Sequence, residues 1–411
     1  MKRLTALLLV LTLLLCGCGC KKANPPATEP TQETELTQVT VAPTVAPTAA
    51  PTAAPTVAPT VAPTAAPTVA PTVAPTAAPT AAPTKAPTVP PTTAPTQGPS
   101  LPPQVADRNP LTGAMLDGTW SGQIAAVMVN NIRDAMPQYG LSQADVIYEI
   151  EEESGITRNM ALYSDVSKVN KIGSIRSTRT AFVSVAAAYD AYLVHCGTSS
   201  HAEGGRYDSK GNKIVEWKDI DQFYKSAYFY RDQDRINSGY AWEHTLFTTG
   251  SLLQKAMNNK DLSETKTGFL FQEKVVLPGD TSAKEVTVKF KGGKTTSFTY
   301  DEASGLYTRS QYGGVTVDGS TNETVKVKNI IALYTNQWRC SCWSDGHQFY
   351  DTIGSGEGYA AVNGKIVPIK WSRASVDAPF IYTLEDGSYL QLDVGSSYIA
   401  LIGIKHPISY K

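Results

Sequence analysis

The chain has 411 residues, of which 42% are hydrophobic and 18% are charged, and its formal net charge at pH 7 is −1. A nearly neutral chain lacks the basic footprint with which proteins bind nucleic acid, so we expect no nucleic-acid partner. Only three of the six cysteines lie beyond the first 20 residues and the five histidines are scattered, which argues against a disulfide framework and a zinc motif.

The first residues have the pattern of a lipoprotein signal peptide. An apolar run from Leu4 to Leu15 is shorter than the roughly 20 residues of a membrane span. Cys18 has a leucine three positions before it and a glycine directly before it, as in a lipid-attachment motif. We predict a signal peptide over residues 1–17 and acylation of Cys18, for example with palmitate, on the outer face of a bacterial cytoplasmic membrane. The alternative is an ordinary secretory signal with incidental cysteines.

A low-complexity stalk is predicted over residues 18–106. A four-residue unit ending in Pro-Thr repeats from Val41 to Thr96. Proline at every fourth position blocks helices and sheet ladders and favours an extended, disordered segment. At about 3.1 Å per residue, such a segment could reach on the order of 250 Å and carry a folded region into the cell wall. The alternative is a linker whose length hardly matters.

Residues 107–260 are predicted to form an α/β domain with a largely parallel or mixed sheet, because strand-like and helix-like patterns alternate. The predicted strands are Ile124–Val129, Ala144–Ile150, Thr157–Tyr163, Lys171–Ile175 and Ala191–Val194, and the predicted helices are Thr180–Ala191 and Ser251–Asn258.

Residues 285–411 are predicted to form an all-β domain, either a sandwich or a small barrel. Short alternating segments dominate this region, and turn sequences such as Asn363-Gly364 separate them. Trp338, Trp343 and Trp371 either form a surface for a sugar or a peptide or belong to the core.

Polar side chains follow several of the predicted strands of the first domain. They are Asn130 after the first strand, the acidic run Glu149 to Glu153 at the end of the second, Arg176 and Arg179 after the fourth, and His195 at the end of the fifth. If these strands are parallel, their carboxyl ends meet at one edge, where open sheets bind ligands. His244, which lies before the last predicted helix, is a further ligand-binding candidate.

Two arginines open the predicted helix. Ser177 or Thr178 could cap this helix, whose free N–H groups and flanking guanidinium groups would suit a phosphate or carboxylate. The alternative is that Arg176 and Arg179 pair with the acidic run and hold the domain together.

Glu149, Glu151 and Glu153 would share one face of a strand. Three like charges on a buried face either raise the pKa of one carboxyl for proton transfer or bind a divalent cation, the only cofactor that the sequence suggests. The alternative is a charge run in solvent. Glu149 and His195 are the catalytic acid–base candidates, with a structural histidine as the alternative; Cys196 would point to the opposite sheet face from His195.

Several long motifs resemble those of the YerB-like bacterial lipoproteins. They include Asn109-Pro110-Leu111-Thr112-Gly113, Ile172-Gly173-Ser174-Ile175-Arg176-Ser177-Thr178-Arg179 and Lys370-Trp371-Ser372-Arg373, and the resemblance spans nearly all of the folded region. It implies a surface lipoprotein with an N-terminal and a C-terminal family domain. It implies no activity or catalytic residue.

Three functions remain open at this point. The first is a binding or scaffold lipoprotein that engages cell-wall polymer or an envelope protein. The second is an envelope enzyme, a hydrolase or transferase, that acts on an anionic substrate through an Arg/Glu/His crevice. The third is a solute receptor, which the presence of two different domain types disfavours.

Overall fold

The computed structural model describes residues 100, 102–199, 218–257, 267–339, 346–403, 405 and 408–411, all within one compact unit. The predicted lipidation site Cys18 and the stalk lie outside the described residues. So do Cys340, Cys342 and Trp343.

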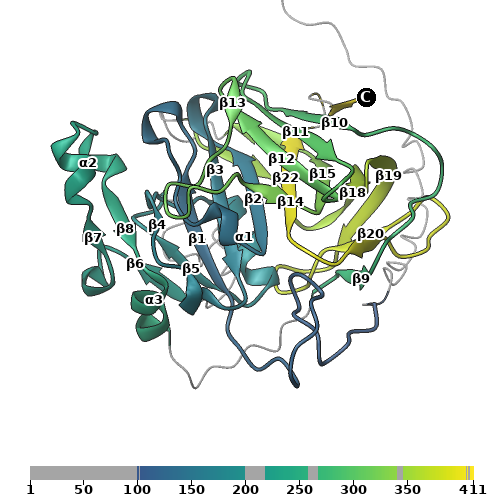
Figure 1. Cartoon of the computed structure of the whole chain (residues 1–411), viewed down its shortest axis with the longest axis horizontal. Helices are drawn as coiled ribbons and strands as arrows, with labels where there is room; N and C mark the ends of the chain where they lie inside the picture. The colour runs from purple at the N-terminus through teal and green to yellow at the C-terminus, as the bar shows by residue number, and fades with distance from the viewer. Residues whose placement is uncertain are drawn as a thin grey trace, which may run out of the picture. The chain divides into compact units, whose positions relative to one another are not determined.

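Ten described strands form the main sheet, which runs across the molecule in Figure 1. In spatial order they are β20 (Ile381–Thr383), β19 (Lys365–Arg373), β18 (Gly354–Val362), β15 (Asn329–Thr335), β22 (Ser397–Gly403), β2 (Val146–Glu151), β3 (Thr157–Tyr163), β1 (Ala125–Asn130), β5 (Tyr192–His195) and β6 (Asp219–Asp221). Nearly every residue of the central strands β1, β15 and β22 is buried, so these strands are covered on both faces.

The two predicted domains share this sheet. Strand β2 of the first segment pairs in parallel with β22 of the second, with Glu149 opposite Ala400, and β22 pairs in parallel with β15. The core therefore continues from one segment into the other through main-chain hydrogen bonds.

A second, smaller sheet packs on one face of the main sheet. Its strands are β13 (Gly314–Val315), β12 (Leu306–Gln311), β11 (Thr295–Asp301), β10 (Glu285–Lys289) and β23 (Ser409–Tyr410), with β14 (Lys326–Val327) paired to β12. Phe298 of this sheet and Tyr398 of the main sheet have ring centroids 4.7 Å apart. The C-terminal segment thus completes a sandwich against a sheet that both segments build.

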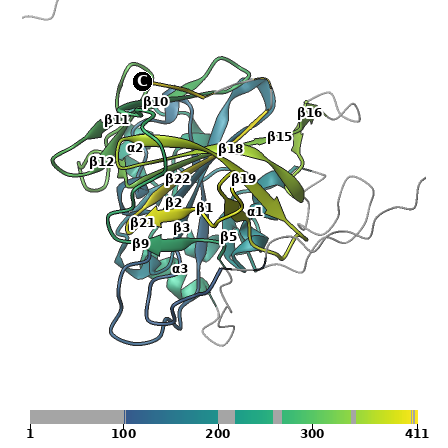
Figure 2. The same ribbon diagram turned by 90° about the vertical axis from the view of Figure 1, so that its right-hand side faces the viewer.

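Three small sheets complete the strand inventory of the described residues. The first contains β4 (Ile172–Gly173), β8 (Leu246–Thr248) and β7 (Tyr230–Arg231), and the second pairs β16 (Gln337–Arg339) with β17 (Gln348–Tyr350). The third pairs β9 (Leu270–Gln272) with β21 (Gln391–Asp393), and these two strands lie side by side in Figure 2.

The described helices are short. They are α1 (Thr180–Ala188), α2 (Gln233–Asn237) and α3 (Gly250–Ala256), with 3-10 turns η1 (Arg133–Ala135), η2 (Leu141–Gln143), η3 (Glu153–Gly155), η4 (Val166–Lys168), η6 (Ser226–Tyr228) and η7 (Trp242–His244). None of the helices in the described ranges is long and apolar enough to cross a membrane.

The prediction of an α/β first domain is therefore confirmed only in part. The sheet is mixed, as one of the two alternatives stated, because β3 runs antiparallel between β1 and β2. Strands dominate, however, and the predicted fourth strand is reduced to the two residues of β4, outside the main sheet. The described part of the second segment contains strands and no helix, as predicted.

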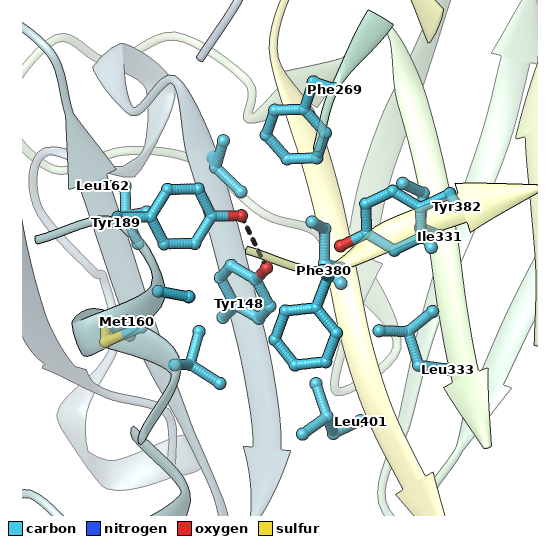
Figure 3. Close-up of a cluster of buried hydrophobic side chains, with 14 of the residues drawn as sticks. Tyr148, Met160, Leu162, Tyr189, Phe269, Ile331, Leu333, Phe380, Tyr382 and Leu401 are labelled. Atoms are coloured by element: carbon cyan, nitrogen blue, oxygen red, sulfur yellow. Dashed lines mark hydrogen bonds between the residues drawn. The ribbon is translucent and has the colours of Figure 1, made fainter. Parts of the chain in front are cut away.

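Two hydrophobic cores lie on the two faces of the main sheet. The first packs under α1 and contains Tyr148 and Ile150, while the second lies toward the smaller sheet and contains Ile147 and Tyr398. Figure 3 shows the first core, where the Tyr148 and Tyr189 hydroxyl groups form a 2.7 Å hydrogen bond among apolar side chains. This alternation along β2 decides which glutamates face which core.

Candidate functional site

One edge of the main sheet carries the carboxyl ends of seven described strands, one of which is β19, since β18 runs antiparallel to both β15 and β19. Strands β1, β5 and β6 are parallel, β2, β22 and β15 are parallel, and β1 and β2 are both antiparallel to β3. Three of the four strands predicted to converge, β1, β2 and β5, end at this edge. Strand β3 lies between β1 and β2, and the fourth predicted strand, β4, lies outside the main sheet. Such an edge is where open sheets bind ligands.

The backbone of Arg176 closes this edge between β1 and β5. Its N–H donates to the Met128 carbonyl at 3.1 Å, and its carbonyl accepts from the N–H of Cys196 at 3.2 Å. The Arg176 side chain is 24% exposed, and its guanidinium group has a long ion pair of 3.8 Å with Glu243. Arg176 is thus fixed at its backbone while its charge faces solvent.

Glu243 links Arg176 to His244, which in turn contacts Asn130. The Asn130 amide lies 3.0 Å from His244 Nδ1, and His244 Nε2 lies 3.6 Å from Glu243. Burial, together with the nearby Arg176 charge, lowers the pKa of His244 despite the opposing effect of Glu243. A neutral ring that accepts from Asn130 at Nδ1 would direct its Nε2 proton toward Glu243. Three of the predicted ligand-binding residues therefore form one connected group.

Arg179 has a different role. It is the N-cap residue of α1, and no side chain caps that helix, so the prediction of a Ser177 or Thr178 cap is wrong. Its Nε donates to Glu153 at 3.0 Å, and its side chain is 10% exposed. The alternative that an arginine pairs with the acidic run is the correct one for Arg179.

Arg158 shares the same carboxylate. Its Nη2 lies 3.0 Å from Glu153 Oε1, and its Nη1 donates to the Ser177 carbonyl at 2.9 Å. Burial alone would raise the pKa of Glu153, but the hydrogen bond from Arg179 and the charge of Arg158 lower it to about 2. Glu153 therefore stays ionised, and its ion pairs with Arg158 and Arg179 fix the backbone after β2.

Glu149 lies inside the sandwich, away from the open edge. Its side chain is fully buried and accepts hydrogen bonds from Asn131, Thr157, Thr296, Arg309, Gln311 and Tyr398. Burial would raise the pKa of Glu149, but the charges of Arg309 and Lys294 lower it overall. A carboxylate with both oxygens occupied by donors holds the two sheets together and has no access to a substrate.

The three glutamates predicted to bind a metal have separate partners. Glu151 accepts from the N–H of Gly292 at 3.2 Å, while Glu149 and Glu153 belong to the two networks just described. Among the described residues, no group of three His, Cys, Asp or Glu side chains could hold a metal ion. The structure therefore does not assemble the predicted cation site.

His195 is also enclosed. It is 2% exposed, its Nε2 lies 2.7 Å from Asp219 of β6, and its Nδ1 lies 2.9 Å from the Gly197 carbonyl. It follows Val194 on β5 and so faces the first core, opposite to Glu149. Three strand spacings of about 4.8 Å, roughly 14 Å, separate β2 from β5. The structure does not bring Glu149 and His195 into one crevice, so the predicted acid–base pair is not formed.

Glu152 was not predicted as a site residue. It is fully buried, neither carboxylate oxygen has a hydrogen-bond partner, and the neighbouring Arg158 Nε is also unpartnered. Burial raises the pKa of Glu152 to about 8 in spite of the Arg158 and Arg179 charges. The sequence did contain a signal for its burial. Glu152 directly follows a buried strand, and the alternation of side chains along that strand directs Glu152 toward the first core.

Two cavities in the described residues lie away from this edge. One of about 530 Å³ is lined by residues that include Trp120, Gln123 and Ser164, and one of about 310 Å³ by residues that include Arg108 and Phe271. Gln123 precedes β1 and Ser164 follows the antiparallel β3, so the larger cavity is at the amino end of β1. We place the candidate site at the carboxyl edge instead, because the charged groups gather there.

Comparisons with known proteins give the family. Residues 111–263 match the model "Protein of unknown function (DUF3048) N-terminal domain", and residues 286–399 match the corresponding C-terminal domain. "Putative lipoprotein YerB" of Bacillus subtilis (strain 168) is 27% identical over 282 residues, which cover 67% of this chain and 80% of that protein. The crystal structure of YerB protein from Bacillus subtilis has the same fold, with a TM-score of 0.61 at 24% identity over 74% of this chain and 99% of that one. The chain belongs to the YerB-like family with its two domains.

Proposed function

We propose that this protein is a lipid-anchored surface lipoprotein whose folded region binds an anionic component of the cell envelope. The anchor rests on Cys18 in its lipobox-like sequence and on the similarity to a protein named as a lipoprotein. A stalk over residues 18–106 would carry the folded region away from the bilayer, where wall polymers and envelope proteins are within reach.

Membrane attachment has a direct test. The full chain should partition with membranes and incorporate labelled palmitate, and Cys18→Ala should abolish the label and release the exported protein from the membrane fraction. Label that persists in the variant, or a wild-type chain found entirely free of membranes, would remove the anchor from the proposal.

The observation that carries the binding proposal is the state of Arg176. Its backbone is fixed between β1 and β5, its guanidinium group is partly exposed, and its ion pair with Glu243 is long. Arg158 and Arg179, by contrast, are committed to Glu153. A guanidinium group held in this way matches the carboxylate and phosphate groups of wall polymers.

Binding is tested with the full mature chain in detergent and with purified wall polymers of known charge, over a series of salt concentrations. Arg176→Ala should weaken binding about tenfold or more and leave the melting temperature nearly unchanged. Lys326→Ala removes one exposed charge on the smaller sheet and serves as the matched control. Equal affinities for the two variants, or a large loss of stability in Arg176→Ala, would contradict this role.

A further inference from the structure

Three exposed aromatic side chains lie in connections next to the segment that carries Arg176. Phe223 is 70% exposed, Tyr224 is 83% exposed and Trp242 is 63% exposed. They come from two connections, one after β6 and one in η7, and Figure 1 shows β6, β7 and β8 grouped at the same end of the molecule. Rings this exposed bury little apolar surface and so stabilise the fold little. A group of exposed rings marks a binding surface more often than single exposed rings do.

Phe223 is held beside the Arg176 loop. Asp221 accepts from the N–H groups of Gly197 at 2.9 Å and Phe223 at 3.1 Å, which fixes the turn after β6. A Cβ atom on Gly197 would lie 2.9 Å from the Phe223 ring and 3.8 Å from Ser177 Oγ. The ring therefore lies against the loop that carries Arg176.

Trp242 is held by Arg231 and directly precedes a partner of Arg176. The Arg231 guanidinium group lies 4.3 Å from the Trp242 ring centroid and donates to the Trp242 carbonyl at 2.6 Å. The next residue, Glu243, is the ion-pair partner of Arg176. Burial and the Asp221 charge raise the pKa of the Cys196 thiol, and the charges of Arg231 and Arg176 oppose that rise, so both arginines lie near the thiol. Two arginines and the aromatic rings thus share one surface.

We propose that this surface binds a glycan that carries carboxylate groups. The proposal rests on the proposed anion-binding function and specifies its ligand. Exposed ring faces stack on the C–H faces of sugars, and guanidinium groups pair with carboxylates in a defined geometry. The exposed aliphatic side chains among the described residues, such as Val105, Val276 and Ile353, belong to other parts of the chain. Aromatic residues and arginines are also enriched at protein interfaces, but such interfaces add an apolar centre, and no exposed aliphatic side chain of the described residues lies in these two connections. A charged sugar chain therefore fits this surface better than a protein does.

The test uses the full mature chain and four probes of matched length: oligogalacturonate, a neutral malto-oligosaccharide, polyphosphate and polyglutamate. Oligogalacturonate should bind more tightly than the neutral sugar. Trp242→Ala and Arg176→Ala should each weaken its binding about tenfold, while Trp338→Ala, which removes an exposed tryptophan beyond the end of β15, should not. Unchanged melting temperatures of the three variants would exclude unfolding as the cause of weaker binding.

The outcomes separate the two proposals. If polyphosphate and oligogalacturonate both depend on Arg176 and neither depends on Trp242, the glycan proposal is overturned and the anion-binding function stands. If polyglutamate alone binds in a Trp242-dependent way, the partner is an acidic protein and the glycan proposal is again overturned. If no probe depends on Arg176, both proposals fail.

Discussion

Three neighbouring glutamates at the end of β2 have three different electrostatic environments. Glu149 is surrounded by donors that hold its pKa low, and the pKa of Glu153 falls to about 2 beside Arg158 and Arg179. Glu152, between them, is buried without a hydrogen-bond partner, and its pKa rises to about 8. The fold around each carboxyl, rather than the residue type, therefore decides its charge near neutral pH.

Glu152 should make stability fall as pH rises. Its pKa is about 8 in the folded chain and about 4.5 in the unfolded chain, so between these values the folded state alone keeps the proton. Stability from this group is complete below about pH 4.5 and is lost progressively up to about pH 8. The wild type should therefore lose on the order of 3 kcal/mol of its free energy of unfolding between pH 5 and pH 8, and Glu152→Gln should not show this loss. Urea unfolding at four pH values measures this difference.

Glu153→Gln is the matched control for that experiment. The folded-state pKa of Glu153 is depressed to about 2, so its contribution is present above the unfolded pKa and is lost only as pH falls through about 2. Its substitution should lower stability by a constant amount across pH 5 to 8. Parallel curves for wild type and Glu152→Gln would show that Glu152 is ionised in the folded chain.

For single residues, the sequence predicts the place of a side chain in the fold better than it predicts the residues that the side chain contacts. Asn130 and Arg176 could be placed at one edge because each follows a buried strand. The fate of Glu149 could not be predicted, since Arg309, Gln311 and Tyr398 are more than 150 residues away in the chain and meet it only in the folded sandwich.

At the scale of elements, the β10–β11 hairpin is docked against the end of β2 through two glycines. A Cβ atom on Gly292 would lie 2.3 Å from the Gly155 Cα atom, and the Gly292 N–H donates to Glu151. Lys294 in the same turn reaches the Asn131 carbonyl. The hairpin tip therefore sits where a side chain has no room.

Gly292→Ala should push the hairpin away from β2 and lower the free energy of unfolding by about 2–3 kcal/mol, since overpacked sites cannot relax fully. Gly293→Ala is the control, because a Cβ atom there meets nothing within 4 Å and the residue has only its positive φ of 85° to maintain. That change should cost about 1 kcal/mol, because a residue with a Cβ atom is strained at positive φ. Denaturant unfolding compares the two variants, and an equal or smaller loss for Gly292→Ala would refute the close contact.

The elements of the first segment were predicted unevenly. The predicted bounds of β1, β2 and β3 agree with the structure to within two residues at each end, and for β1 the continuous apolar run of a strand buried on both faces was the signal. Strands β6, β7 and β8 have two or three residues each and no such pattern, so they were missed. Their positions depend on tertiary contacts rather than on local sequence.

At the scale of the whole molecule, the sequence suggested two domains in series, at residues 107–260 and 285–411. The structure joins these segments through one continuous sheet, with β22 inserted between β15 and β2. Parallel pairing between strands some 250 residues apart has no local signature, so periodicity alone could not predict it.

This arrangement predicts that the first segment cannot fold by itself. Without residues 267–411, β2 becomes an exposed apolar edge, and Glu149 loses four of its six hydrogen-bonding residues and keeps Asn131 and Thr157. A buried carboxylate stripped of its cationic partner costs about 3–5 kcal/mol, a large share of the stability of an ordinary domain. Residues 107–266 alone should therefore show no cooperative urea transition and no native near-ultraviolet circular dichroism. Mixing with residues 267–411 should restore both, because the β2–β22 pairing and the Glu149 network re-form together. A cooperative transition in the isolated first segment would mean instead that the shared sheet is an interface between two independently stable domains.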